Sequence, residues 1–305
     1  MSTVSSRIAA AAAVGAALLP GGQALAHGFA GDRFFPATIL TDDPFVADEM
    51  SLPTLTRPPT ANDGTQEYDV EIDIAKRILP DLGVTFARQW KYVQVPGAPA
   101  VTGFDAIRTG LQYQLFINPK HEAMALFGVQ TTWGHTGRVQ ALGSPDFTTI
   151  TPTFDWGKGF GDLPESLPYL RPFAITGNLS VDFPTKVESN GNPNSNNLNY
   201  GFALEYSLEY LQHHVRDVGI GRPFDHLIPL VEVSLTTPLN RGQGGNTTGT
   251  VQPGFIWSGQ YYQLGAELIV PVNRLSGRGI GGLVQFHLYL DDLFPRSIGR
   301  PLFEY

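Results

Sequence analysis

Residues 198–211 read LNYGFALEYSLEYL, and this stretch decides the fold class. Every second residue in it is large and apolar: Leu198, Tyr200, Phe202, Leu204, Tyr206, Leu208 and Tyr210. The residues between them are small or polar and include two glutamates. Successive side chains of a strand point to opposite faces, so the stretch predicts a strand with one apolar face and one polar, acidic face. The pattern alone leaves open whether the apolar face contacts a protein core or lipid.

The same alternation returns in about eleven stretches from residue 66 onward, each roughly 10 to 14 residues long. Strands of soluble proteins usually have about 5 to 6 residues, whereas a tilted strand that crosses a bilayer needs about 9 to 11. The length of the stretches therefore favours lipid as the partner of the apolar face. Aromatic residues near the ends of several stretches, such as Trp90, Trp133 and Trp257, suit the interfacial girdles of a membrane barrel.

The composition agrees with an exported membrane protein. Charged residues make up 16% of the 305 residues, which is low beside the roughly 25% of a soluble domain. The chain has no cysteine, and this excludes disulfides, thiol nucleophiles and cysteine-based zinc sites. The formal charge of −8 disfavours nucleic acid as a partner.

The N-terminus has the features of a secretory signal peptide. Arg7 precedes an apolar stretch at 8–19, and Ala24-Leu25-Ala26 supplies small residues at a cleavage site before His27. The apolar run is about 12 residues long, while a membrane-spanning helix needs about 20. We therefore predict a signal peptide over 1–26 and export from the cytoplasm.

Short turns and long polar loops alternate between the predicted strands, as they do in outer-membrane barrels, where the short turns are periplasmic. Tight turns are expected at 80–83, 118–120 and 258–260, and the loop at 188–197 (ESNGNPNSNN) is among the long ones. Two connections on the turn side are exceptions, and the one at 158–169 has the length for a short helix.

An even strand number requires one more strand before residue 67, for which 46–57 is the candidate although its alternation is poor. The predicted fold class is all-β, a closed antiparallel transmembrane β-barrel of twelve strands, with ten as the alternative. The predicted organisation is a plug or periplasmic segment at 27–45, a barrel over 46–290 and a periplasmic tail at 291–305.

If lipid solvates the apolar face, the polar face must line the lumen of the closed sheet. The candidate pore-lining residues carry ionisable side chains on that face: Asp69, Glu71, Asp73, Arg108, Glu205, Glu209, Glu232, Glu267 and His287. One interpretation is a cation-favouring pathway, since walls of one sign concentrate counter-ions. The other is that the acids pair with lumen arginines, such as Arg77, and fill a narrow barrel.

Enzyme and metal chemistry have weaker support in the sequence. A serine hydrolase needs Ser, His and an acid within hydrogen-bond reach, and Gly-x-Ser-x-Gly does not occur. By parity, His226 and His287 point inward, and a Ser/His/acid cluster at one rim of the structure would favour a barrel enzyme. His27 would become N-terminal after cleavage, and its amine and imidazole could then chelate Cu(II). A residue at this position more often has no role beyond following the cleavage site. We expect no enzyme activity, no cofactor and no metal.

Three segments carry a family resemblance: FDWGKGFGDLPESLPYLRPFAITG (154–177), IPLVEVSLTTPLN (228–240) and GLVQFHLYLDDLFP (282–295). They resemble an uncharacterised family of proteobacterial outer-membrane β-barrel proteins, similar to transporters of the phenol meta-cleavage pathway type. The resemblance implies a twelve-stranded barrel and the uptake or efflux of small molecules, with no catalytic residue to carry over.

The function expected from the sequence is an outer-membrane barrel of a Gram-negative bacterium that passes or binds small solutes through a polar, acidic lumen. The alternatives are a barrel enzyme that acts on lipid and a non-conducting structural barrel. The expected partners are outer-membrane lipid, a small-molecule solute and the barrel-assembly machinery.

Overall fold

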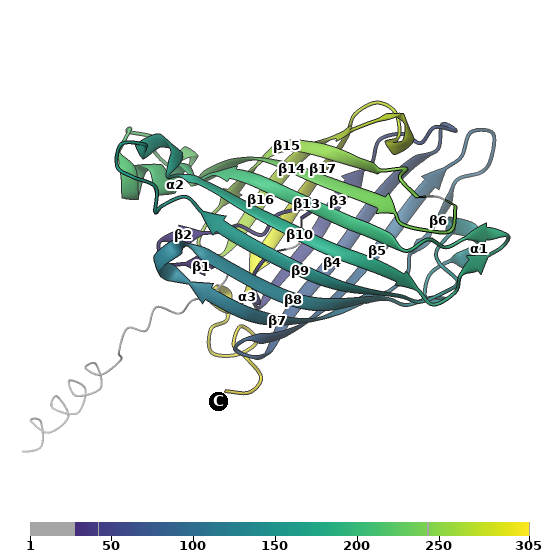
Figure 1. The fold of residues 1–305 in the computed structure, drawn as a ribbon, viewed down its shortest axis with the longest axis horizontal. Coiled ribbons are helices and arrows are strands. Elements are labelled where there is room, and N and C mark those ends of the chain that lie inside the picture. The colour runs from purple at the N-terminus through teal and green to yellow at the C-terminus, as the bar shows by residue number, and fades with distance from the viewer. Residues whose placement is uncertain (1–27, 42, 243, 305) are drawn as a thin grey trace, which may run out of the picture.

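The wall of the molecule is one antiparallel sheet closed on itself (Figure 1). A computed structural model describes residues 28–41, 43–242 and 244–304. The predicted signal peptide and His27 lie outside the described residues. Each strand pairs with its neighbour in the chain, and the last strand pairs with β3, the first of the wall. The predicted closed antiparallel barrel is confirmed.

The described residues form twelve wall strands, because β6 and β7 pair with successive parts of β5 and make up one interrupted strand. The strands are β3 (Glu49–Arg57), β4 (Gln66–Leu79), β5 (Leu82–Gln94), β6 (Val101–Phe104), β7 (Arg108–Asn118), β8 (Ala123–Thr132), β9 (Thr149–Gly159), β10 (Phe173–Pro184), β13 (Asn197–Tyr206), β14 (Leu227–Pro238), β15 (Thr248–Ser258), β16 (Tyr262–Pro271) and β17 (Gly281–Tyr289). Two short hairpins stand apart from the wall: β1 (Phe29–Ala30) with β2 (Arg33–Phe34), and β11 (Glu188–Ser189) with β12 (Asn192–Pro193).

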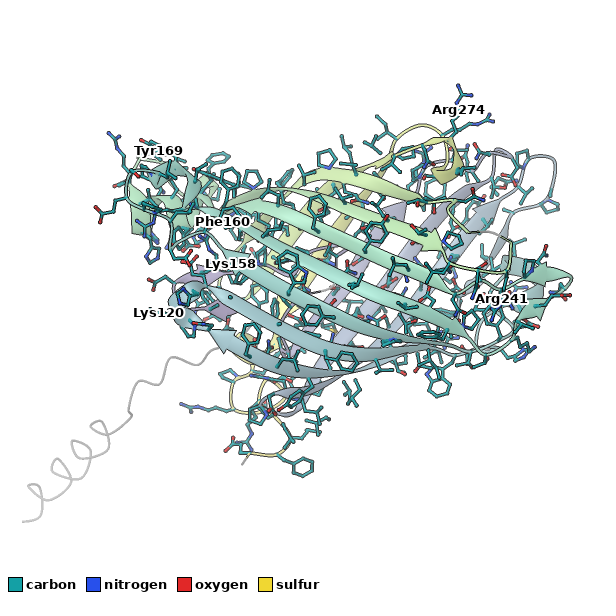
Figure 2. All side chains as sticks on the ribbon, viewed as in Figure 1. Lys120, Lys158, Phe160, Tyr169, Arg241 and Arg274 are labelled. Atoms are coloured by element: carbon teal, nitrogen blue, oxygen red, sulfur yellow. The ribbon has the colours of Figure 1, made fainter. Side chains whose placement is uncertain are left out.

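The two faces of the wall differ as the alternation predicts. Large apolar side chains on the outer face are exposed, for example Leu179 at 48% and Leu268 at 53%. Polar side chains on the inner face are buried, and Glu232 and Gln263 are both 0% exposed. In Figure 2 the labelled basic side chains lie at the two ends of the barrel: Lys120 and Lys158 at one end, Arg241 and Arg274 at the other. An apolar outer band between charged ends is the surface that a bilayer solvates.

The two ends of the barrel are built differently. One end, which we call the turn end, holds the short connections β4–β5, β7–β8 and β15–β16 together with both ends of the described chain (Figure 1). The other, the loop end, holds the long connections, among them the hairpin β11–β12 and α1 (Val139–Leu142). The long turn-end connections contain only short helices: η2 (Pro168–Leu170), α2 (Leu208–Tyr210), η3 (Leu211–Val215) and η4 (Phe224–His226).

The stretch at 198–211 is a strand only as far as Tyr206. Ser207 then accepts a hydrogen bond from the backbone N–H of Tyr210 through its Oγ at 3.1 Å and caps α2. Serine is a preferred helix N-cap, so the chain turns at this point although the alternation continues. Tyr210 is consequently buried at the turn end instead of facing lipid.

The poor alternation at 46–57 has a structural cause. In β3 two residues, Leu52 and Pro53, lie between the paired residues Ser51 and Thr54. The partner strands β17 and β4 each have only one residue in the corresponding interval. This extra residue is a β-bulge, and a bulge changes the parity of the residues that follow it. Ser51 and Thr54 both point inward as a result, and this position in the wall tolerates a proline that cannot donate to the sheet.

After β17 the chain forms α3 (Leu290–Leu293) and returns to the turn end of β4. The backbone N–H groups of Leu302 and Phe303 donate to the carbonyls of Arg77 and Ile78 at 3.2 and 2.9 Å. None of the helices in the described part of the chain is long and apolar enough to cross a membrane.

Candidate functional site: the lumen and its plug

Residues 28–41 and 43–48, which we call the plug, lie inside the barrel at its turn end. Phe35, Ala37, Phe45 and Ala47 are at most 4% exposed, a degree of burial that only enclosure by the wall provides. Phe35, Phe45 and Ala47 belong to one apolar cluster with wall residues Met124 and Ala174. The described part of the segment 27–45 therefore packs against the inner face of the wall.

One carboxylate on the wall holds the centre of the plug. Glu232 on β14 accepts hydrogen bonds from three consecutive backbone N–H groups of the plug, those of Ile39, Leu40 and Thr41, at 2.7, 3.0 and 2.7 Å. Hydrogen bonds to an ionised acceptor are about twice as strong as neutral ones. This contact gives the fully buried Glu232 a partner for both carboxylate oxygens and gives the plug a fixed position.

Two glutamines on opposite sides of the lumen bind the plug backbone. Gln114 on β7 accepts from the N–H of Val46 at 2.9 Å and donates to the carbonyl of Pro44 at 3.0 Å. Gln263 on β16 donates to the carbonyl of Ala37 at 2.5 Å. These contacts satisfy plug backbone groups that lie away from water.

Inward-facing glycines make room for the plug. A Cβ atom at Gly265 would overlap Cδ1 of Ile39, and one at Gly83 would lie 2.6 Å from Cγ1 of Val46. A Cβ at Gly157 would meet the ring of Phe35 at 3.1 Å. The wall is therefore shaped to the plug at three separate strands.

Arg33 anchors the plug hairpin at the turn end. Its Nε lies 3.1 Å from Oε2 of Glu122, its Nη1 donates to the carbonyl of Pro172 at 2.9 Å, and its guanidinium stacks 3.7 Å over the ring of Tyr210. The Tyr210 hydroxyl donates to Oε1 of Glu122 at 2.7 Å. Burial, followed by this hydrogen bond to Glu122, raises the pKa of Tyr210 to about 12. The cluster pairs every charge that it takes out of water.

Between the plug and the wall lies a cavity of about 400 Å³. Its lining comes from plug residues 37–41, 43 and 45 and from the inner faces of β3, β4, β5, β7, β8 and β17. The lining side chains are polar in the main and include Glu71, Asp73 and Arg108, with Gln112 and Gln130 on β7 and β8. A concave site with a few converging polar groups is the usual form of a small-molecule site.

The structure divides the predicted pore-lining residues into four groups. Glu71, Asp73, Arg108 and His287 border the cavity, and Arg108 pairs with Glu71. Asp69, Glu205 and Glu267 face inward but are at most 5% exposed. Glu232 holds the plug and has no contact with open lumen. Glu209 lies in α2 beyond the end of the strand, with a side chain that is 46% exposed, and borders a separate hollow at the turn end that plug residues Phe29 and Phe34 also line.

His226 lies in η4, which precedes β14, and its ring is at the turn end, 6.0 Å from that of Trp257. It borders the same turn-end hollow as Glu209. Arg88 lies on the apolar outer face of β5, where a charged side chain is unexpected. Contacts at the loop end account for its position. Its guanidinium lies 4.6 Å from the ring of Phe104 and donates to the carbonyl of Thr136 at 3.2 Å, so a loop covers its charge.

Sequence reasoning missed Arg33, Gln114 and Gln263 as functional residues. Gln114 and Gln263 occupy inward positions of alternating strands, so the alternation does indicate that they face the lumen. They were not among the candidates because only ionisable side chains were considered. Arg33 falls in a segment without periodicity, where no pattern assigns a partner.

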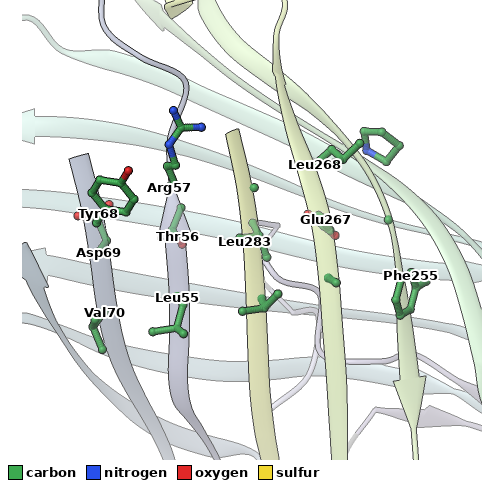
Figure 3. Close-up of a pocket in the computed structure, with 15 residues that line it drawn as sticks. Leu55, Thr56, Arg57, Tyr68, Asp69, Val70, Phe255, Glu267, Leu268 and Leu283 are labelled. Atoms are coloured by element: carbon green, nitrogen blue, oxygen red, sulfur yellow. The ribbon is translucent and has the colours of Figure 1, made fainter. Parts of the chain in front are cut away.

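A second hollow lies along the outer wall (Figure 3). It has a volume of about 740 Å³ and runs over β15, β16, β17, β3 and β4, with Phe255, Leu268, Leu55 and Val70 among its lining residues. Small residues on β16 and β17, such as Ala266 and Gly282, lie among these larger side chains and leave the surface hollow. This apolar furrow belongs to the lipid-facing surface.

No group of three or more His, Cys, Asp or Glu side chains among the described residues is arranged to hold a metal ion.

Comparison with known proteins supports the fold. No protein-family model matches the chain, and no curated protein matches it. Among solved structures, an outer membrane channel from Pseudomonas putida F1 is similar with a TM-score of 0.52 and 11% identity, covering 84% of this chain and 99% of that one. The NanC porin has a TM-score of 0.46 and 7% identity, covering 78% of this chain and 98% of that one.

The fold is therefore that of a closed antiparallel transmembrane β-barrel. Within that class, the chain is a twelve-stranded barrel whose lumen holds its own N-proximal segment.

Proposed function

We propose that this barrel binds a small polar solute in the lumen cavity and passes it across the outer membrane of a Gram-negative bacterium when the plug is displaced. The observation that carries the proposal is the cavity of about 400 Å³ between the plug and the inner wall, bordered by Glu71, Asp73 and Arg108. The outer membrane channel from Pseudomonas putida supports the fold on which the proposal is built. We also propose that the barrel belongs with transporters of the phenol meta-cleavage pathway type, which the segments 154–177, 228–240 and 282–295 resemble.

The orientation and partners form part of the same proposal. Short turns of outer-membrane barrels face the periplasm, so the turn end and both chain ends belong on that side. Cleavage after Ala26 would leave residues 27–48 to enter the bore from the periplasm. Outer-membrane lipid covers the apolar band, and the barrel-assembly machinery inserts the chain.

Acidic side chains at the cavity give the pathway a preference for cations. Glu71 and Asp73 belong to adjacent inward positions on β4, and Arg108 pairs with Glu71. Rings of acidic side chains select cations in other channels.

The hydrogen bonds that hold the plug favour a second candidate, a non-conducting structural barrel. The two candidates differ in a planar-bilayer recording of folded protein, compared between the wild type and Gly265→Leu, a substitution that fills the space of Ile39. Conductance that increases in the variant is expected. No conductance and no solute flux in either protein, over repeated preparations, would leave the structural barrel as the correct function.

A further inference from the structure

Three residues of the wall form a Ser–His–acid arrangement at the edge of the lumen cavity. Ser51 Oγ lies 2.9 Å from Nδ1 of His287, within hydrogen-bond distance, and Nε2 of the same ring lies 3.3 Å from Oε2 of Glu49. The residues belong to β3 and β17, the strands that close the barrel. All three border the cavity of about 400 Å³. We propose that Ser51, His287 and Glu49 form a hydrolase site for short-chain carboxylic esters inside the lumen.

The β-bulge at Leu52 and Pro53 builds this site. It lies directly after Ser51 and opposite the interval between Gln285 and His287, so the paired strands change register beside the serine. Bulges are common next to active sites, where they change the direction of a side chain. A regular strand would place either Ser51 or Thr54, but not both, on the inner face.

The burial of the three residues suits the chemistry of a general base. Ser51, His287 and Glu49 are 7%, 3% and 7% exposed. The contact of Nε2 with the Glu49 carboxylate has the distance of an ion pair but not the geometry of a hydrogen bond. In the tautomer that carries its proton on Nε2, Nδ1 has a free lone pair and accepts the hydrogen bond of the serine hydroxyl. The familiar serine hydrolase triad uses the two ring nitrogens in the reverse roles, but either nitrogen can accept a proton.

The reaction follows the acyl-transfer route. Ser51 Oγ attacks the carbonyl carbon of the ester while its proton passes to Nδ1 of His287. The bond from that carbon to the alcohol oxygen then breaks, and His287 returns the proton to the departing oxygen, which leaves an acyl group on Ser51. Water attacks the acyl carbon, again with proton transfer to Nδ1, and the proton returns to Ser51 Oγ as the acid leaves. One ester and one water thus become one acid and one alcohol.

Gln285 offers a donor for the oxyanion that forms during the attack. It lies two residues before His287, borders the same cavity and donates through Nε2 to Oγ1 of Thr54 at 3.2 Å. Amide donors of this kind stabilise the tetrahedral intermediate in other hydrolases. The site lies inside the bore, so small esters can reach it from water. Membrane lipids contact only the outer face of the barrel and are excluded as substrates.

The first test uses the full chain folded in detergent, with p-nitrophenyl acetate as substrate and a small alkyl fluorophosphonate as covalent probe. Hydrolysis and probe attachment at Ser51 are expected in the wild type. Ser51→Ala should abolish both, and His287→Asn should lower kcat/KM by about 10³-fold or more. The matched control is Ser180→Ala, an inward, buried serine that contacts Asn199 and should leave both readouts unchanged. Folding of each variant is checked by its heat-dependent gel mobility.

The second test separates positioning by Glu49 from a structural role. Glu49→Gln should lower kcat and shift the pH–rate profile, and Glu49→Asp should recover part of both. A structural role would lower only the yield of folded protein. The inference is overturned if folded wild type hydrolyses the ester no faster than Ser51→Ala, or if the probe attaches elsewhere while Ser51→Ala retains full activity. Neither outcome depends on whether the barrel conducts.

Discussion

The side-chain carboxylate of Glu232 accepts a hydrogen bond from the backbone N–H of Thr41 at 2.7 Å, although the two residues are 191 positions apart in the chain. The contact joins the plug to the wall strand β14. It is one of three that the same carboxylate makes, so the charge of Glu232 controls how firmly the plug is held.

Glu232→Gln is expected to loosen the plug. The substitution keeps the shape of the side chain but removes the charge, and a hydrogen bond to a charged group is worth about 1.5 kcal/mol or more, which corresponds to about a ten-fold larger displaced population. Single-channel recording should show more frequent open events. Glu205→Gln is the matched control because Glu205 faces inward on the neighbouring strand and accepts a hydrogen bond from wall residue Thr176 at 3.3 Å. Equal open probability in both variants would contradict the role of Glu232.

Gly265→Leu is expected to displace Ile39 from the wall. A Cβ atom alone would overlap Cδ1 of Ile39, and a leucine has no space to turn into. The plug should then become accessible to a protease added from the turn side, measured as cleavage within 28–48. Gly282→Leu on β17 is the control, because this glycine is on the outer face and a Cβ atom there would meet only a backbone oxygen, at 3.5 Å. Protection of the plug in both variants would show that the wall does not hold it through this contact.

Glu71→Gln and Asp73→Asn together are expected to lower the preference of the pathway for cations. One exposed charge interaction is worth up to about 1 kcal/mol, so the cation-to-anion permeability ratio should fall about two- to five-fold. Reversal potentials in a salt gradient measure this ratio. Glu209→Gln should leave it unchanged, since Glu209 lies in α2 outside the wall. A ratio that responds to Glu209 instead would place the selective region at the turn end.

Arg33→Met is expected to destabilise the barrel because it leaves the Glu122 carboxylate buried without its cation, at a cost of about 3–5 kcal/mol. The temperature at which gel mobility changes should fall clearly. Lys186→Met is the control, since its partner Asp146 forms a surface pair at 3.0 Å and exposed pairs contribute little. If both variants melt at the same temperature as the wild type, the Arg33 cluster does not hold the turn end together.

Tyr210→Phe is expected to change the alkaline stability of the protein. The folded-state pKa of Tyr210 is raised from 10.0 to about 12, so its contribution is fully present below pH 10 and is lost as the pH rises towards 12. The wild type should lose stability across that interval, and the variant should lose less there while starting from a lower value. Melting temperatures from pH 9 to 12 measure the difference. Parallel curves for the two proteins would assign the alkaline loss to other groups.

The barrel could be predicted from the sequence because alternation records which face of a strand meets lipid, and this signal is local. The strand predicted over 198–211 ends at Tyr206, because Ser207 caps a helix although the alternation continues. The strand at 46–57 carries a weak signal because the bulge after Ser51 reverses parity partway along it.

The site could be predicted only in part. Parity places His287 in the lumen, but its contact with Ser51 joins residues 236 positions apart, and no local pattern encodes which two strands close the barrel. The plug has no periodicity of its own, because its backbone is satisfied by side chains such as Glu232 and Gln114 instead of a regular ladder.

The connection of the plug to β3 has a consequence for assembly. Residues 28–48 run directly into the strand that pairs with β17, so the seam joins the earliest and the latest parts of the wall. Contacts between such distant segments require the costliest loop closure in folding, and they form late for that reason. We therefore expect the plug to enter the bore in the same step in which β3 pairs with β17 and β4 and closes the barrel.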